Sequence, residues 1–167
     1  MAYDAFLKID GITGESQKDK HKGEIEVSSF SLGATNPTSV GVGTGLASGK
    51  VQLADFSVVK PTDKASPTLF LNCCAGKSFS KATASIQKAT GGSTGETYLQ
   101  YDFTNVFVTS IQWSGSGGAG GGGHDTPHET VTFSFEAMKI IYKPQNADGS
   151  LGSQQMAGWN QATNAKL

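Results

Sequence analysis

The run from Glu129 to Tyr142 constrains the fold most, because apolar and polar residues alternate along much of it. Alternation with a period of two is typical of a β-strand with one buried face. The parity of the apolar residues changes near Glu136 and Ala137, from Val131, Phe133 and Phe135 to Met138, Ile140 and Tyr142. The change predicts either a β-bulge or a stretch that is buried on both faces. A bulge would bend the strand, which suits a closed or strongly curved sheet.

Six further segments have strand patterns, each bounded by Gly, Asn, Pro or Ser clusters. The candidates are residues Ala5–Ile9, Ile25–Leu32, Val51–Val59, Phe79–Lys88, Thr97–Phe103 and Val106–Trp113. We therefore expect a mainly β protein, a barrel or sandwich of antiparallel strands, as a single domain over residues 1–167.

One short helix is expected beside the sheet. Ser66 can cap it, Pro67 suits its first position, and Gly76 is a natural stop. The pairs Leu69/Cys73 and Phe70/Cys74 recur at a spacing of four and form an apolar stripe that should lie on the sheet. Adjacent helical cysteines point about 100° apart, so we expect two buried free thiols rather than a disulfide.

Composition excludes several classes of function. The net charge is −1 and all 13 basic residues are lysine, so the guanidinium fork that reads guanine edges and phosphates is missing and nucleic-acid binding is not expected. Charged residues make up only 16% of the chain, which fits a surface covered by neighbouring copies or a loop-rich protein with uncharged faces. The chain has no signal-peptide pattern and no apolar run long enough to span a membrane, so we expect cytoplasmic folding and no membrane insertion.

No motif predicts catalysis, a metal site or a cofactor. Ser93 lies in a G-x-S-x-G pattern, but a strand pattern follows it where a nucleophile elbow needs a helix. The stretch His124–Glu129 holds four possible metal ligands, yet it follows a glycine run and contains Pro127, so a solvated loop entering a strand is expected. The glycines before Lys50 miss the spacing of a phosphate-binding loop.

A set of collinear motifs points to a family. They are Tyr3–Gly11, Gly14–Ser16, Asp19–His21, Glu24–Val27, Ser29–Gly33, Gly49–Val51, Asp63–Pro67, Gly76–Lys77, Tyr142–Gly149 and Gly158–Trp159. Together they resemble Hcp, the tube-forming protein of the bacterial type VI secretion system. The resemblance implies a compact β-barrel with a flanking helix and no enzymatic activity. It implies hexameric rings of identical copies that stack into a tube, a contractile sheath around it, a VgrG spike at its tip, and secreted effectors in its lumen.

The resemblance and the residues together predict two functional surfaces. The small, weakly charged segment from Gly33 to Gly49 should contact an adjoining subunit or ring, with a disordered loop as the alternative. The expected contact residues are Val40, Gly41, Val42, Gly43, Gly45, Leu46 and Gly49 in this segment, and Lys50 directly after it. Ser29 and Ser31 lie opposite the apolar Phe30 and should line the lumen, with an ordinary solvent-facing strand as the alternative.

Two rival functions remain open at this point. A monomeric β-sandwich could bind carbohydrate through Trp113 or Trp159, and a serine hydrolase could act through Ser93. The tube subunit is the reading we prefer, with assembly in the cytoplasm and secretion without a signal peptide.

Overall fold

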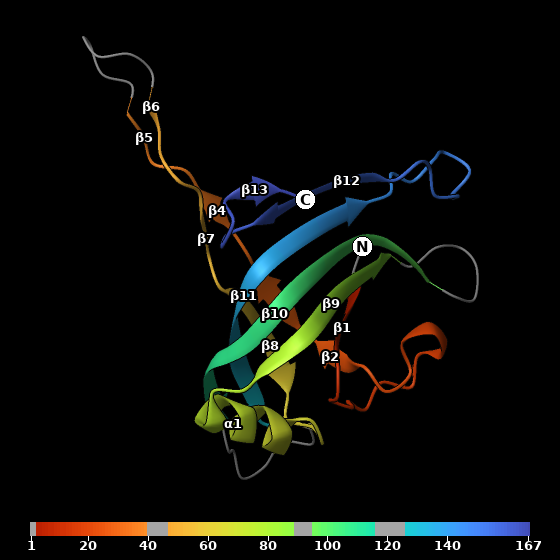
Figure 1. Ribbon diagram of the computed structural model, residues 1–167. Helices are drawn as coiled ribbons and strands as arrows, with labels where there is room; N and C mark the ends of the chain where they lie inside the picture. Colours follow the sequence, from red (N-terminus) through yellow and green to blue (C-terminus); the bar gives the residue numbers. More distant parts are fainter. Residues whose placement is uncertain (1–2, 40–46, 89–94, 116–125) are drawn as a thin grey trace.

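The computed structural model describes residues 3–39, 47–88, 95–115 and 126–167 (Figure 1). This part of the chain is antiparallel β structure with one α-helix, as the sequence predicts. The elements are β1 (Tyr3–Ile9), a 3-10 turn η1 (Asp19–His21), β2 (Ile25–Val27), β3 (Ser29–Ser31), β4 (Ala34–Thr35), β5 (Thr38–Ser39), β6 (Ala47–Ser48), β7 (Gln52–Leu53), β8 (Phe56–Pro61), α1 (Ser66–Ala75), β9 (Ser78–Lys88), β10 (Glu96–Ser114), β11 (His128–Tyr142), β12 (Gln155–Asn160) and β13 (Ala165–Lys166).

The main sheet curls back on itself into a barrel-like body. Its strands follow the order β13-β12-β11-β10-β9-β1-β2, and β8 also pairs with β11 and carries β3 on its other side. Since β2 and β3 are consecutive in the chain, Ser28 connects the two ends of the curled sheet, and its amide donates to the carbonyl of Val59 at 2.8 Å. Among the described residues β2 and β3 do not pair in a ladder, so it is the continuous chain at Ser28 that joins the two ends of the sheet.

The expectation of one strand from Ile25 to Leu32 was therefore wrong. The chain leaves β1 after Val27 and joins β8 at Ser29, opposite Val59. A single strand cannot keep both neighbours in register around so tight a curve, and the small residue Ser28 lies at the corner.

The change in the parity of the apolar residues along β11 does not come from a bulge in that strand. Its first half pairs with β8, from His128 to Phe133, and its second half pairs with β12, from Ala137 to Tyr142. The side chains that are buried in the body keep one parity up to Ala137, whereas Met138 and Ile140 line a groove on the other face. A stretch covered on both faces was thus the correct alternative.

The irregularities lie in β10 instead, which is one strand where two were predicted. The β10–β11 register shifts between Val108 and Ser110, and the β9–β10 register shifts between Thr97 and Leu99. Asn105 has a left-handed backbone with φ 49°, which L-residues other than Asn and Asp rarely adopt. The strand bends at these points instead of ending, because pairing with β9 and β11 continues on both sides.

Helix α1 begins one residue earlier than predicted and ends at Ala75, where Gly76 takes a φ of 61°. Ser66 does not cap it: Ala65 is the N-cap residue and the Ser66 side chain is buried. Leu69 packs into the core, whereas Cys73 is half-buried and Cys74 is exposed. Both thiols are free, but the expectation that both would be buried was wrong, because the helix buries only a narrow stripe of its surface and neither cysteine is fully covered.

The core is aromatic and fills the curve of the sheet. Phe103 stacks on Phe56 with ring centroids 4.6 Å apart and lies 4.8 Å from Phe135. Leu7, Ile25 and Leu69 complete it from β1, β2 and α1. Burying large side chains of this kind is the main source of stability in a domain of this size.

Candidate assembly surfaces

A two-stranded arm leaves the body after Leu32. Ala34 pairs with Leu53 in the β4–β7 ladder, and Thr38 pairs with Ser48 in the β5–β6 ladder beyond it. Figure 1 shows β5 and β6 standing clear of the barrel-like body. An isolated two-stranded ribbon is marginally stable in water, so a ribbon that projects in this way is best explained by a contact beyond its own chain.

The predicted contact residues divide into two sets. Val40, Gly41, Val42, Gly43, Gly45 and Leu46 lie outside the described residues. Gly49 and Lys50 are exposed at the root of the arm. Gly49 is required there, because a Cβ at this position would lie 2.5 Å from the carbonyl oxygen of Pro37, to which the Gly49 amide donates at 2.9 Å.

An apolar groove of about 570 Å³ lies between the root of the arm and the second half of β11. Val51 and Leu53 form one wall, and Met138 and Ile140 form another. Trp159 on β12 also lines it, and its indole nitrogen is buried with no acceptor among the described residues. This groove was not predicted from the sequence.

Ser29 and Ser31 are both exposed on β3, and Phe30 between them points toward the core. The ring of Phe30 lies 6.3 Å from Tyr3 and 5.9 Å from Tyr101. Burial, followed by repulsion from Tyr98, raises the pKa of the Tyr101 hydroxyl. The two serines present small, uncharged hydroxyl groups on the exposed side of β3, opposite the aromatic side chains of Phe30, Tyr3 and Tyr101.

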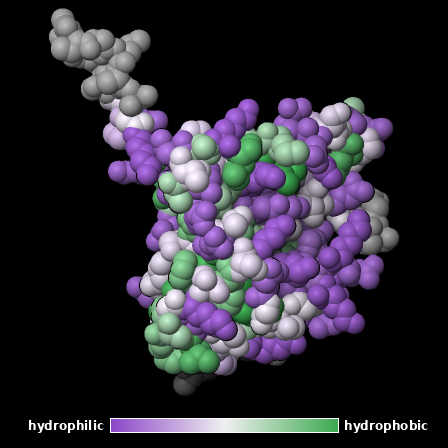
Figure 2. Space-filling view, in the orientation of Figure 1, coloured by the Kyte–Doolittle hydropathy of each residue, from purple (hydrophilic) through white to green (hydrophobic). Residues whose placement is uncertain are grey.

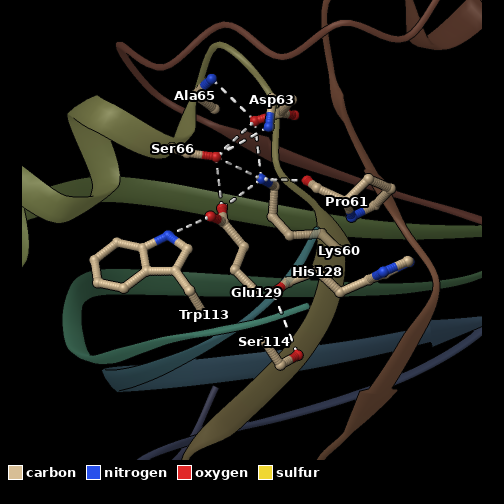
Figure 3. Close-up of polar contacts among 9 residues, drawn as sticks. All are labelled: Lys60, Pro61, Asp63, Ala65, Ser66, Trp113, Ser114, His128 and Glu129. Atoms are coloured by element: carbon tan, nitrogen blue, oxygen red, sulfur yellow. Dashed lines mark hydrogen bonds and ion pairs between the residues drawn. The ribbon is translucent and has the colours of Figure 1, made fainter. Parts of the chain in front are cut away.

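The most extensively bonded side chain cluster joins β8, β11 and α1 (Figure 3). Lys60 is fully buried, and its Nζ donates to Glu129 at 2.6 Å, Asp63 at 2.8 Å, the Pro61 carbonyl at 2.9 Å and Ser66 at 3.2 Å. The Ser66 hydroxyl donates in turn to Glu129 at 2.7 Å. Buried charges need this degree of pairing, since an unpaired one would be strongly destabilising.

This cluster corrects one part of the expectation for His124–Glu129, a solvated loop that enters a strand: Glu129 is not solvated. β11 begins at the exposed His128, and Glu129 is fully buried against Lys60, while His124 and Asp125 lie outside the described residues. In the described part of the chain no group of three potential ligands could hold a metal ion. An alternating lysine and glutamate in two strands carries no signal for such pairing, so the sequence could not reveal it.

Lys60 and Ser66 do not form a catalytic pair despite their contact. The lysine ammonium already donates to two carboxylates, so it has no free lone pair with which to take a proton from the hydroxyl. Both groups are buried, so a substrate has no access to them. Ser93, the other candidate nucleophile, lies outside the described residues.

A second polar cluster fixes β12 against the kink in β10. Asn105 and Asn160 both donate to the Glu136 carboxylate, the latter at 3.0 Å. These two hydrogen bonds hold the pKa of Glu136 below its ordinary value. The left-handed Asn105 backbone aims its amide at this carboxylate, which gives the strained residue a structural purpose.

Comparison with known proteins agrees with this architecture. Residues 6–142 match the family described as "Type VI secretion system effector, Hcp". The chain is 37% identical to Protein hcp1 of Pseudomonas aeruginosa over 161 residues, 96% of either protein. It superposes on a solved structure described as that of a type six secretion system protein with a TM-score of 0.90 and 36% identity, covering 99% of this chain and 100% of that one. Hcp1 from Salmonella typhimurium gives 0.79 and 36%, with 100% of each chain covered.

The barrel-like antiparallel sheet, its single described helix and these matches define a component of the type VI secretion system. The chain belongs to the Hcp family. Proteins of this family are structural, non-enzymatic and secreted by that system, which excludes the serine hydrolase reading. No helix in the described ranges is long and apolar enough to cross a bilayer.

Proposed function

We propose that this chain is the repeating subunit of the inner tube of a type VI secretion system. Six copies close head-to-tail into a ring, and rings stack into a tube. The projecting arm is the observation that carries this proposal, since β5 and β6 leave the body as an unsupported ribbon. A contact with an identical neighbour would give the ribbon the packing that it lacks.

The exposed surface supports the same conclusion. Large apolar side chains are exposed at several separate places, namely Tyr3, Phe70, Leu71, Phe107, Trp113, Tyr142, Met156 and Leu167. Apolar side chains scattered singly are ordinary on a protein surface, but contiguous ones, such as Phe70 and Trp113 with ring centroids 5.7 Å apart, typically mark an interaction site. Identical copies in a closed ring would cover several of these places at once.

In the assembled tube, Ser29 and Ser31 line the lumen, where effectors travel. Small hydroxyl groups bind water and offer no fixed charge, so they suit a channel for varied cargo. The contractile sheath surrounds the tube and the VgrG spike closes its tip. The subunit is assembled in the cytoplasm and leaves the cell with the tube.

A monomeric carbohydrate-binding module is the weaker alternative. Trp113 lies opposite Glu129 on β11 and Trp159 lies opposite Met138, so the two rings are nine residues apart along that strand, about 30 Å. They therefore cannot form one sugar-binding platform, and Trp159 is partly buried.

Size-exclusion chromatography with light scattering, followed by negative-stain imaging, tests the proposal. We expect a particle of six times the 17.3 kDa chain mass and annular images with six-fold symmetry. A protein that stays monomeric and is retained on a glycan array would support the alternative instead.

A further inference from the structure

An apolar patch covers the end of the body formed by α1 and β10. Its residues are Phe70, Leu71 and Trp113, whose side chains are 47%, 64% and 54% exposed. The Phe70 and Trp113 rings meet edge-to-face with centroids 5.7 Å apart. Figure 2 shows hydrophobic residues gathered at this end of the molecule, over the position of α1 in Figure 1.

The buried cluster holds this patch in place. The Trp113 indole donates to Glu129 at 3.0 Å, through the carboxylate oxygen that Lys60 and Ser66 leave free. Figure 3 shows the indole lying against the buried cluster that also holds the first turn of α1 through Ser66. The Trp113 ring is therefore held in place before any partner arrives, and the Phe70 ring packs against it. Fixed, half-exposed aromatic rings lose little entropy on binding and are typical anchors of protein interfaces.

The exposed face of α1 also lacks the charges that solvate most surface helices. The helix sequence from Ser66 to Ala75 contains no acidic or basic residue. Its exposed positions are Pro67, Thr68, Phe70, Leu71, Cys74 and Ala75. A helix face that is both exposed and uncharged is suited to contact with an equally uncharged partner surface.

The arm of the same chain has matching properties and lies at the other end of the body. From Gly33 to Gly49 the arm contains no charged residue, and Lys50 at its root is the one charged side chain in the sequence between Gly33 and Leu53. Along β11, the patch lies at Glu129 and the root of the arm lies at Met138, a separation of nine residues or about 30 Å. In Figure 1 the described strands of the arm, β5 and β6, lie on the far side of the body from α1.

We propose that the Phe70–Leu71–Trp113 patch is the receptor for the arm of a second copy of this chain. A projection at one end and a receptor at the other make a heterologous contact, which propagates from copy to copy as rings and tubes require. The inference rests on the proposed function and adds to it the surface that receives the arm.

Cross-linking between an arm and the exposed native Cys74 tests the proposal. Cys73→Ser leaves Cys74, which is one turn beyond Phe70, as the only native thiol. Thr38→Cys then places a second thiol on the exposed β5 strand. A short bismaleimide forms one thioether with each thiol, so docking of arms on patches yields a ladder of covalent dimers, trimers and higher multimers.

Three controls define the outcomes. The first control carries Thr38→Cys with both native cysteines replaced by serine, and it should give no ladder. The second carries Ala147→Cys instead of Thr38→Cys, and it should give no ladder either, since Ala147 is exposed on a different loop. The Cys73→Ser protein alone should give no product. A cross-linked dimer of the Cys73→Ser protein, together with no higher multimers of the Thr38→Cys variant, would mean that two patches face each other. That result would overturn the proposal.

Leu71→Asp provides a second measurement. We expect the concentration needed for half-assembly to rise at least about tenfold, with an unchanged circular dichroism spectrum. If particles of the ring mass form, but neither the ladder nor the rise in the half-assembly concentration is seen, the patch is not the receptor for the arm. The proposed tube function stands in that case. If the chain stays monomeric throughout, both fail.

Discussion

Lys60 and Glu129 lie directly opposite each other on β8 and β11, and their side chains form an ion pair of 2.6 Å with no exposed surface. Trp113 lies opposite Glu129 on the other side of β11, so the pair links the ends of β8 and β10 and the beginning of β11 to an exposed ring. Ser66 adds α1 to the same cluster. The position of the helix thus depends on a charge pair in the interior.

Lys60→Met should destabilise the protein by about 3–5 kcal/mol, because Glu129 and Asp63 would be left buried without their cation. Chemical denaturation at a fixed protein concentration measures the change. The exposed Lys64→Met is the control, and we expect its effect to stay within about 0.5 kcal/mol. Equal effects of the two substitutions would contradict the role of the buried pair.

Removing both charges should be less harmful than removing one. In Lys60→Met with Glu129→Leu the remaining acid of the cluster is Asp63, which is partly exposed and still accepts from the Ala65 amide at 3.0 Å. We therefore expect the double variant to be more stable than Lys60→Met alone, as in other buried pairs replaced by apolar residues. A double variant that loses the sum of both single effects would show that the two side chains act independently.

Gly49→Ala should weaken assembly without unfolding the body. The added Cβ would lie 2.5 Å from the Pro37 carbonyl oxygen and would force the β5–β6 ladder apart, whereas the core is remote from it. Sedimentation should show fewer rings at an unchanged melting temperature. Gly33→Ala is a matched control, because its Cβ would meet only Ala54 at an ordinary 3.8 Å. Rings that survive Gly49→Ala intact would argue against the arm as a contact.

Asn160→Ala should raise the pKa of Glu136, since one of the two hydrogen bonds that favour its charged form would be lost. A carboxyl group with a lowered folded-state pKa stabilises the fold above its unfolded-state value, and this contribution disappears as the pH falls through the folded-state value. An NMR titration of the Glu136 carboxyl carbon measures the change. A titration identical to that of the wild type would show that the Asn160 amide does not hold the carboxylate in solution.

Spin labels at Ser31 test the lumenal position of β3. With both native cysteines replaced by serine, a label on Ser31→Cys should give shorter distances between copies than labels at the exposed positions Lys8, Lys64 and Lys77. Residues at the inner wall of a ring lie closest to its axis, so equivalent sites are closest together there. Ser31 distances longer than all three references would place β3 on the outer wall.

The sequence predicts the strand class, the helix and the family, because local alternation and collinear motifs carry that information. It does not predict the corner at Ser28 or the single long β10, since both depend on which strands are neighbours in space. The parity change at Ala137 is visible in the sequence, but only the exchange of β8 for β12 explains it. The burial of Glu129 was missed for the same reason, because its partners come from β8 and α1.

Native mass spectrometry of the purified chain tests the central claim most directly. The account predicts a dominant species of six subunits, each of 17.3 kDa, that falls to smaller species when the arm root is disrupted by Gly49→Ala. A wild-type spectrum that contains only the 17.3 kDa chain, even at high protein concentration, would contradict it.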